Sequence, residues 1–297
     1  MNKMNRRQFI QTGLTGLAGL SVISTGIINL NCSTPVALKI DNVKLGKSGL
    51  TVSRIAMGTG THGGNKSSDF TRMGMEQFTK LALHAYERGI TFFDTADSYG
   101  SHQFVGNVLK SLPREKITLL SKMWTSEDPN RREPFEKAID RFRLETGSDY
   151  FDILLMHCLQ SGNWSETRKY YIDEFSKAKQ DGIVKAVGVS CHNFDALAEA
   201  VEHPWVDVIM VRINPFGTNM DSTPDKVKEV LEKAKNNNIG LIGMKIFGEG
   251  KNVKDEERQQ SLEYAIKEVN THCMTLGMTS ELQVDDAVER VLKIVKV

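Results

Sequence analysis

Short apolar runs alternate with longer stretches of helical periodicity along most of this chain. In the helical stretches apolar residues recur at intervals of three and four, as at Phe78, Leu81, Ala82 and Ala85, which gives a helix one apolar face. The apolar runs predict strands near residues 53–57, 91–93, 117–121, 151–156, 184–189, 206–211, 240–244 and 273–276. The periodic stretches between them predict helices, among others over residues 74–88, 133–146, 165–181 and 224–237.

Eight strand–helix units indicate an α/β fold, because a (β/α)8 TIM barrel needs roughly 250 residues and eight such units. The competing fold is a doubly wound sheet, which places Gly-x-Gly-x-x-Gly after its first strand. Here the first strand is followed by Gly-Thr-Gly-Thr-His-Gly-Gly at 58–64, where the glycines have a different spacing. We therefore predict one barrel over residues 36–297, with its active site at the carboxyl ends of the strands.

Composition adds limits on size and partners. The 297 residues are 40% hydrophobic, enough to bury the core of one large domain or two small ones. The net charge of +1 gives no basic field, which argues against nucleic acid as a partner. A phosphate-bearing cofactor is still compatible with this charge, because a few backbone amides and one or two lysines can hold it.

The N-terminal segment, residues 1–34, differs from the rest. Arg6-Arg7-x-Phe9-Ile10 precedes a weakly apolar stretch and resembles a twin-arginine export signal. We expect the export machinery of that route as a partner and a periplasmic or cell-envelope location, where free nicotinamide nucleotide is not expected. The alternative is a disordered or membrane-anchoring segment. Cys32 is a candidate for lipidation, although Asn29-Leu30-Asn31 before it matches a lipoprotein box poorly.

The cysteines do not form a disulfide framework. Four of them, Cys32, Cys158, Cys191 and Cys273, are too few and too scattered for that. We expect free thiols packed in the barrel wall. A single bridge between Cys158 and Cys191, which follow neighbouring predicted strands, is the alternative.

Four polar residues lie at or just past the ends of successive predicted strands, namely Asp94, Tyr99, Lys122 and His157. Reduction of a carbonyl leaves negative charge on oxygen, so the reaction requires a positioned proton donor. Tyr99 can donate the proton if the ammonium of Lys122 favours its phenolate. Asp94 can hold the lysine, and His157 can donate a hydrogen bond to the substrate oxygen. The set predicts a reductase.

Residues 91–100, Thr-Phe-Phe-Asp-Thr-Ala-Asp-Ser-Tyr-Gly, resemble the aldo-keto reductase signature Asp-x-x-x-x-Tyr-Gly. Residues 45–53 resemble the opening hairpin of that family. The resemblance implies an NAD(P)(H)-dependent oxidoreductase that interconverts a small-molecule aldehyde or ketone, with sugars among the candidates, and an alcohol. It assigns catalysis to Asp94, Tyr99, Lys122 and His157, with Tyr99 as general acid and base.

The same resemblance implies NADP(H) or NAD(H) as cofactor. The cofactor-binding residues expected from it are Gly58, Thr59, Asp94, Ser190, Phe216, Lys245, Gly248, Gly277, Thr279, Ser280, Gln283 and Asp286. Three departures stand out. Cys191 replaces the asparagine after Ser190, and the run 210–216 lacks the usual glutamine. Gly277 and Gln283 stand where NADPH-preferring members often have Lys and Arg, so we predict reduced NADPH selectivity and use of NAD(H).

The sequence also indicates substrate residues and leaves two alternative functions open. Trp124 and His157 are expected to line the substrate mouth. A metal-dependent barrel hydrolase would use His157, Cys158, Cys191 and His192 with Asp94. Strand alternation opposes it, because Cys158 should point out of the barrel if His157 points in, and we predict no metal. A non-catalytic nucleotide-binding accessory protein is the second alternative, against which the complete set of four residues argues.

Overall fold

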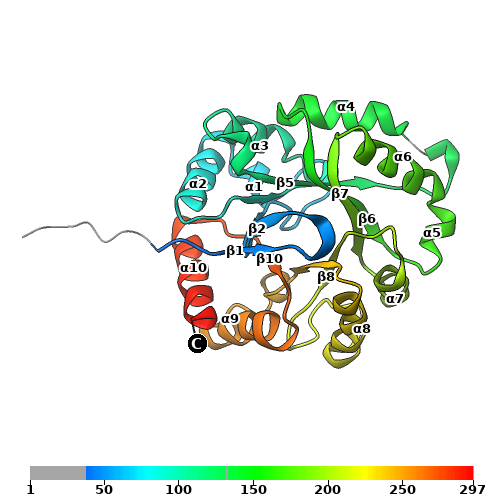
Figure 1. Cartoon of the computed structure of the whole chain (residues 1–297). Helices are drawn as coiled ribbons and strands as arrows, with labels where there is room; N and C mark the ends of the chain where they lie inside the picture. The colour runs from blue at the N-terminus through cyan, green and yellow to red at the C-terminus, as the bar shows by residue number, and fades with distance from the viewer. Residues whose placement is uncertain (1–37, 132, 297) are drawn as a thin grey trace, which may run out of the picture. The chain divides into compact units, whose positions relative to one another are not determined.

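Eight parallel strands close into a barrel with helices around it in the computed structural model, which describes residues 38–131 and 133–296 (Figure 1). The strands are β3 (Ile55–Gly58), β4 (Phe92–Asp94), β5 (Thr118–Trp124), β6 (Phe151–Leu159), β7 (Val184–Cys191), β8 (Val208–Arg212), β9 (Gly240–Met244) and β10 (Cys273–Leu276). Neighbours follow chain order, and β10 pairs with β3 to close the ring. The predicted (β/α)8 barrel is confirmed.

Helices connect the strands on the outside of the barrel. They are α1 (Asp69–Arg72), α2 (Met75–Glu87), α3 (His102–Leu109), α4 (Phe135–Thr146), α5 (Trp164–Thr167), α6 (Lys169–Gln180), α7 (Phe194–Glu202), α8 (Pro224–Asn236), α9 (Asp255–Glu263) and α10 (Glu281–Val295). A π-helical turn, Tyr264–Glu268, follows α9. The single helix predicted over 165–181 is wrong. Arg168 leaves helical geometry with φ −112° and ψ 18° and separates α5 from α6.

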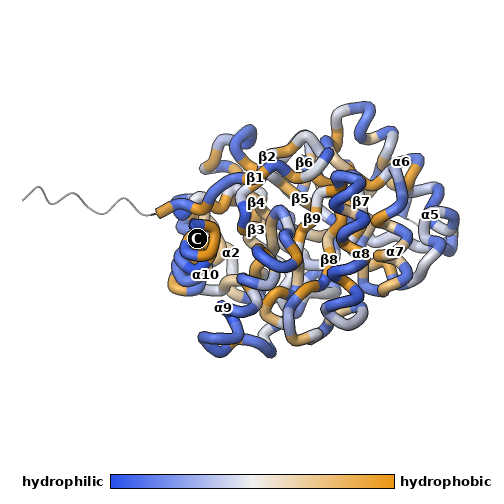
Figure 2. The backbone as a smooth tube through the Cα atoms, turned by 60° about the horizontal axis from the view of Figure 1, so that its bottom comes forward, coloured by the Kyte–Doolittle hydropathy of each residue, from blue (hydrophilic) through white to orange (hydrophobic). Residues whose placement is uncertain are grey.

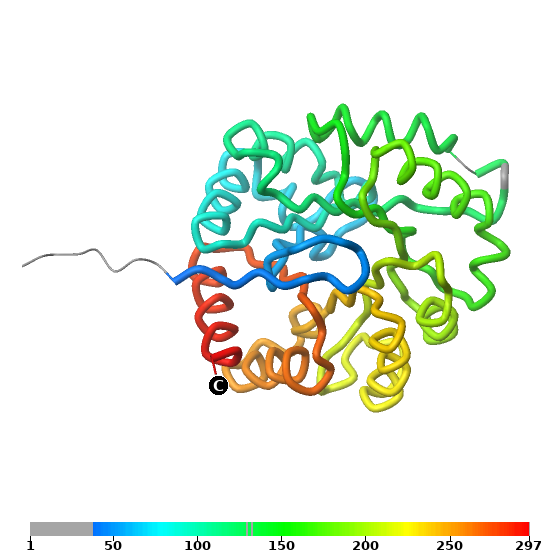
Figure 3. The backbone as a smooth tube through the Cα atoms, in the orientation of Figure 1, coloured from blue at the N-terminus to red at the C-terminus, as the bar shows by residue number. Residues whose placement is uncertain are grey.

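A hairpin closes the amino-terminal end of the barrel. Its strands β1 (Asn42–Lys44) and β2 (Thr51–Ser53) pair antiparallel, and Figure 3 shows this blue segment lying across the ring of strands. Leu45 and Val52 are fully buried with the interior side chains of the barrel. They remove the apolar floor of the barrel from water, which leaves the opposite end for the site.

Regular alternation along the strands fixes which side chains face the barrel interior. Phe92, Leu120, Leu155, Ala186 and Met210 belong to the interior cluster. The residues two positions nearer the carboxyl ends of these strands therefore also face the interior. Four of them are polar, namely Asp94, Lys122, His157 and Arg212. Figure 2 shows the strands as mainly hydrophobic and the outer turns of the helices as mainly hydrophilic.

The closing seam is also linked on the outside. Asp285 of α10 accepts a hydrogen bond of 2.7 Å from Arg88 Nη1 and lies 2.9 Å from His84 Nε2 of α2. Figure 3 shows α10 in red beside α2 in cyan. Asp285 thus joins the last helix to the first long one.

Some predictions concern the N-terminal segment. Arg6, Arg7 and Cys32 lie outside the described residues, so export, anchoring, lipidation and the domain boundary at residue 36 stay predictions. Within residues 38–131 and 133–296, no helix combines the length and apolar character that membrane spanning requires. Cys158, Cys191 and Cys273 are free thiols, as expected.

Candidate active site

Three of the four predicted catalytic residues belong to strands: Asp94 is the last residue of β4, and Lys122 and His157 lie inside β5 and β6. Strand β5 continues through Lys122 to Trp124, and β6 continues through His157 to Leu159. This corrects the predicted strand ends at 121 and 156. Because Leu120 and Leu155 face the interior, the strand backbone directs Lys122 and His157 into the barrel as well.

Asp94 and Lys122 form a buried ion pair. The exposed fractions of the whole residues are 4% and 0%, and Lys122 Nζ donates to Asp94 Oδ1 and, at 2.9 Å, to the carbonyl of Thr95. Thr275 Oγ1 of β10 donates to the other carboxylate oxygen of Asp94 at 2.8 Å. Burial lowers the pKa of Lys122, but Asp94 and Tyr99 together raise it above its ordinary value, so the ammonium is held charged.

Tyr99 ends a 3-10 turn, η2 (Asp97–Tyr99), and its ring lies over this ion pair. Lys122 Nζ is 4.8 Å from the ring centroid, and Tyr99 Oη is 3.5 Å from His157 Nε2. Gly60 packs against the ring so closely that a β-carbon there would overlap it. Burial raises the pKa of Tyr99, Lys122 opposes that shift, and the balance lies above the ordinary value. The phenol is therefore protonated at neutral pH.

His157 is a neutral imidazole beside the phenol. Burial lowers its pKa well below 6.5, and the charge of Lys122 lowers it further. Ser98 Oγ lies 3.5 Å from Nδ1, and the Trp124 ring meets the imidazole edge-on at 5.8 Å between centroids. A neutral imidazole can donate one hydrogen bond to a substrate oxygen.

A charged cluster behind Tyr99 fixes the η2 turn. Arg141 of α4 donates to Asp97 at 2.6 Å, and Lys66 donates to the same carboxylate. Burial raises the pKa of Asp97, but these two partners lower it below its usual value overall. Among the described residues, Asp97, His102 and Glu145 form one group with metal-ligand spacing. Arg141 already pairs with both of its carboxylates.

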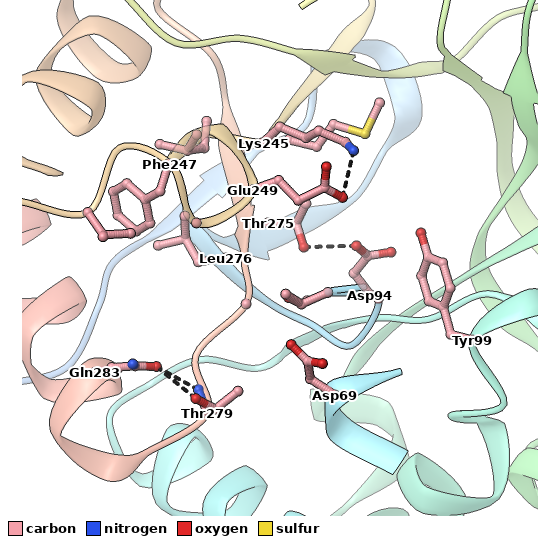
Figure 4. A pocket seen from close by; sticks show the side chains of 18 of the residues that line it. Asp69, Asp94, Tyr99, Lys245, Phe247, Glu249, Thr275, Leu276, Thr279 and Gln283 are labelled. Atoms are coloured by element: carbon pink, nitrogen blue, oxygen red, sulfur yellow. Dashed lines mark hydrogen bonds and ion pairs between the residues drawn. The ribbon is translucent and has the colours of Figure 1, made fainter. Parts of the chain in front are cut away.

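A cavity of about 290 Å³ runs from the Asp94–Tyr99 end of the barrel mouth to the start of α10 (Figure 4). In addition to Tyr99, six predicted site residues line it, namely Gly58, Asp94, Lys245, Gly277, Thr279 and Gln283. It is also lined by residues that sequence reasoning missed, including Gly60, Thr61, Met210, Met244 and Thr275. Figure 4 shows Lys245 paired with Glu249, a contact of 2.8 Å, on one wall.

Other predicted cofactor residues do not line this cavity. Thr59 is buried and donates to the carbonyl of Asp94 at 2.8 Å, and Ser280 caps α10. Asp286 pairs with Arg290 at 2.9 Å, away from the lining. Phe216 is 42% exposed and is absent from the lining, whereas the flexible side chains of Met210 and Met244 form part of it. Gly248, with φ +57°, begins the short turn η5 (Gly248–Gly250).

The residues present fit a nicotinamide nucleotide. Ser190 is 1% exposed and its Oγ lacks a hydrogen-bond partner among the described residues, which suits a carboxamide beside it. Lys245 provides a cation for a pyrophosphate, and the cavity continues to Thr279 and Gln283 at the amino end of α10. NAD(P)(H) would be held along the cavity by Lys245 and by the residues at the amino end of α10, whereas Ser190 is not part of the lining.

The ligands required by the hydrolase hypothesis do not converge. Cys191 is fully buried in the outer cluster between strands and helices. The argument from regular alternation at Cys158 is itself wrong, because β6 has a bulge there: the register shifts between Met156 and Leu159, and Cys158 has φ +61°. The thiol is half-buried, and burial raises its pKa although Arg212 and Lys245 oppose this.

Comparisons with known proteins identify a family and a shared fold. Residues 54–297 match the model of the aldo/keto reductase family. A probable aldo-keto reductase 1 of Glycine max is 28% identical over 224 residues, 71% of this chain and 61% of the soybean protein, so the match spans less than two thirds of that relative. L-galactose dehydrogenase of Arabidopsis thaliana is 26% identical, covering 80% and 77%. A putative aldo-keto reductase structure from Pseudomonas aeruginosa superimposes with a TM-score of 0.70 at 18% identity, covering 89% and 99%, and shows the shared fold.

Proposed function

The chain belongs to the aldo/keto reductase family, whose members are NAD(P)(H)-dependent oxidoreductases, and on that premise we propose that it interconverts a carbonyl and an alcohol at Tyr99. Tyr99 is the general acid in reduction and the general base in oxidation. The observation that carries this proposal is the 3.5 Å separation of Tyr99 Oη and His157 Nε2 above the buried Asp94–Lys122 pair. A non-catalytic nucleotide-binding accessory protein, the alternative, would not require this arrangement of the four residues.

The substrate oxygen lies between the two donors in this mechanism. His157 donates a hydrogen bond to it, and Tyr99 transfers its proton as charge develops there. The bound nicotinamide nucleotide supplies the hydride in reduction and accepts it in oxidation. Lys122 stabilises the phenolate left behind, and Asp94 with Thr275 keeps the ammonium in place.

For the cofactor, we propose that this chain uses NAD(H) at least as well as NADP(H). Gln283 is engaged with its own loop, since its Oε1 accepts from the amide of Thr279 at 2.7 Å. Gly277 provides no cation. A 2′-phosphate therefore meets no fixed positive charge at these two positions.

For the substrate, we propose a small carbonyl compound that reaches an open mouth. Trp124 is 58% exposed and borders His157, so it provides an aromatic wall. A sugar is one candidate, because the Arabidopsis relative is named L-galactose dehydrogenase.

The test is turnover of 4-nitrobenzaldehyde with NADH or NADPH by the full chain and by Tyr99→Phe. We expect the substitution to lower kcat at least a hundredfold, because the proton donor is lost. Tyr99→Phe should still bind the nucleotide, which is measured by the quenching of protein fluorescence. Unchanged turnover in Tyr99→Phe would contradict the assignment, and binding without any turnover in the wild type would favour the accessory protein.

We also propose that residues 1–34 direct export by the twin-arginine route, with the nucleotide carried in the folded barrel. The support is the sequence Arg6-Arg7-x-Phe9-Ile10. Cell fractionation of the wild type and of Arg6→Lys/Arg7→Lys tests it, with retention of the double variant in the cytoplasm as the expected result. Native mass spectrometry of the exported protein should detect one bound nucleotide.

A further inference from the structure

Two basic residues extend the polar layer at the mouth of the barrel beyond the proposed catalytic residues. Met210 faces the barrel interior, so Arg212, two positions later at the end of β8, faces the same side. Ala186 also faces the interior, and the same periodicity assigns Ser190 to that face, with His192 just past the end of β7. Ser190 and Met210 are register partners on β7 and β8. His192 follows β7 by one residue and is close enough to Arg212 for the charge of Arg212 to lower its pKa.

A carboxylate behind Arg212 orients its guanidinium. Arg212 Nη2 donates to Asp221 Oδ1. The Asp221 side chain has no exposed surface, whereas that of Arg212 is 17% exposed. Asp221 therefore lies on the protein side of the pair. Among residues 38–131 and 133–296, Arg212 Nη1 has no acceptor, and Arg212 Nε and Asp221 Oδ2 are buried without a partner, so only one edge of the guanidinium is engaged by the protein.

The groups facing this edge are cationic or neutral. Burial together with the charges of Arg212, Lys245 and Lys122 lowers the pKa of His192 to about 3, so its imidazole is neutral. The charges of Arg212 and Lys245 also oppose the rise in the pKa of Cys158, and Cys158 in turn interacts electrostatically with Tyr99. The nearby carboxylates are each engaged behind a cation: Asp221 with Arg212, Glu249 with Lys245, Asp94 with Lys122.

We propose that Arg212 is the specificity-determining residue of the substrate pocket and that, with His192, it binds a carboxylate on the substrate. The preferred substrates are thus carbonyl compounds that carry an acidic group. This inference rests on the proposed function of Tyr99. The guanidinium edge provides direct hydrogen bonds to the carboxylate, and the neutral imidazole provides a further donor.

The experiment compares 3- and 4-carboxybenzaldehyde with 3- and 4-methylbenzaldehyde, which have similar shapes without the charge. We expect the full chain to show at least a tenfold higher kcat/KM for one acid than for its methyl counterpart. In Arg212→Gln that ratio should fall at least tenfold, mainly through a higher KM for the acid. Arg143→Gln on the outer helix α4 removes the same charge far from the mouth and should leave the ratio unchanged.

A second variant separates binding from folding. Arg212→Gln leaves the buried carboxylate of Asp221 without its partner, which is strongly destabilising. Arg212→Gln/Asp221→Asn removes both charges, and a thermal melt shows whether it is folded. The folded double variant should also lack the preference for the acid.

The outcomes distinguish the two proposals. Reduction of the methyl compounds with no preference for either acid would overturn the role of Arg212 and leave the reductase assignment intact. A preference that persists in the double variant would also overturn it. Failure to reduce any of the four aldehydes, with nucleotide bound, would overturn the proposed function and this inference with it.

Discussion

Thr275 in β10 reaches across β3 to donate a hydrogen bond of 2.8 Å to Asp94 in β4. The strand between them contributes Gly58, the register partner of Asp94. A β-carbon on Gly58 would lie 2.6 Å from Thr275 Oγ1, so the contact requires glycine there. The closing seam of the barrel thus holds the carboxylate that holds Lys122.

Replacing Lys122 should affect both stability and activity. In Lys122→Met the carboxylate of Asp94 stays buried without its counter-charge, and we expect a loss of about 3–5 kcal/mol in the free energy of unfolding. In Asp94→Asn/Lys122→Met both charges are gone, so most of that stability should return while activity stays low. Urea unfolding and turnover measure the two effects. Full activity in the folded double variant would contradict the role of the ion pair.

Gly60→Ala should impair catalysis through the position of Tyr99. The added methyl group would overlap the phenol ring, so the ring of Tyr99 must shift from its position beside His157, and we expect kcat to fall by about tenfold or more. Gly64→Ala is the matched control, because a β-carbon at Gly64 meets no atom within 4 Å. Equal activities of the two variants would show that the ring tolerates displacement.

The pH dependence of reduction should lack an inflection near 6.5. His157 has a pKa well below 6.5, so lowering the pH through that region leaves its imidazole neutral. Tyr99 has a raised pKa, so raising the pH removes its proton only in the alkaline range. We expect kcat/KM for reduction to be flat between about pH 6 and 9 and to fall above about 10. A loss of activity centred near pH 6.5 that disappears in His157→Gln would contradict these directions.

Selectivity for the nucleotide should respond to charge at residue 283. We expect the wild type to bind NADH at least as tightly as NADPH, because Gln283 offers no fork for a 2′-phosphate. Gln283→Arg should tighten NADPH relative to NADH by about tenfold, a gain of about 1.4 kcal/mol. Fluorescence titration of both nucleotides measures the ratio, with Gln283→Met as the uncharged control. A lysine at residue 277 is a less suitable test, because a β-carbon on Gly277 would overlap Thr61.

The fold and part of the site could be predicted because they depend on local patterns. Apolar runs and helical periodicity predicted all eight barrel strands, and the ends of these strands indicated where Asp94, Lys122 and His157 would gather. The extension of β5 to Trp124 could not be predicted, since Lys122 and Trp124 are stabilised there by pairing with β6. The bulge at Cys158 likewise depends on the shift of register against β7.

The sequence by itself determined the barrel and the chemical groups at its mouth, because the period of the hydrophobic pattern and the residue types at strand ends are local properties. Only the tertiary structure decided which groups meet. Thr275 reaches Asp94 across 181 residues of chain because the barrel closes between β10 and β3. Arg212 and Asp221 pair behind the pocket because of the loop that follows β8. Such contacts depend on how segments distant in the sequence pack together, and a local sequence pattern does not predict that packing.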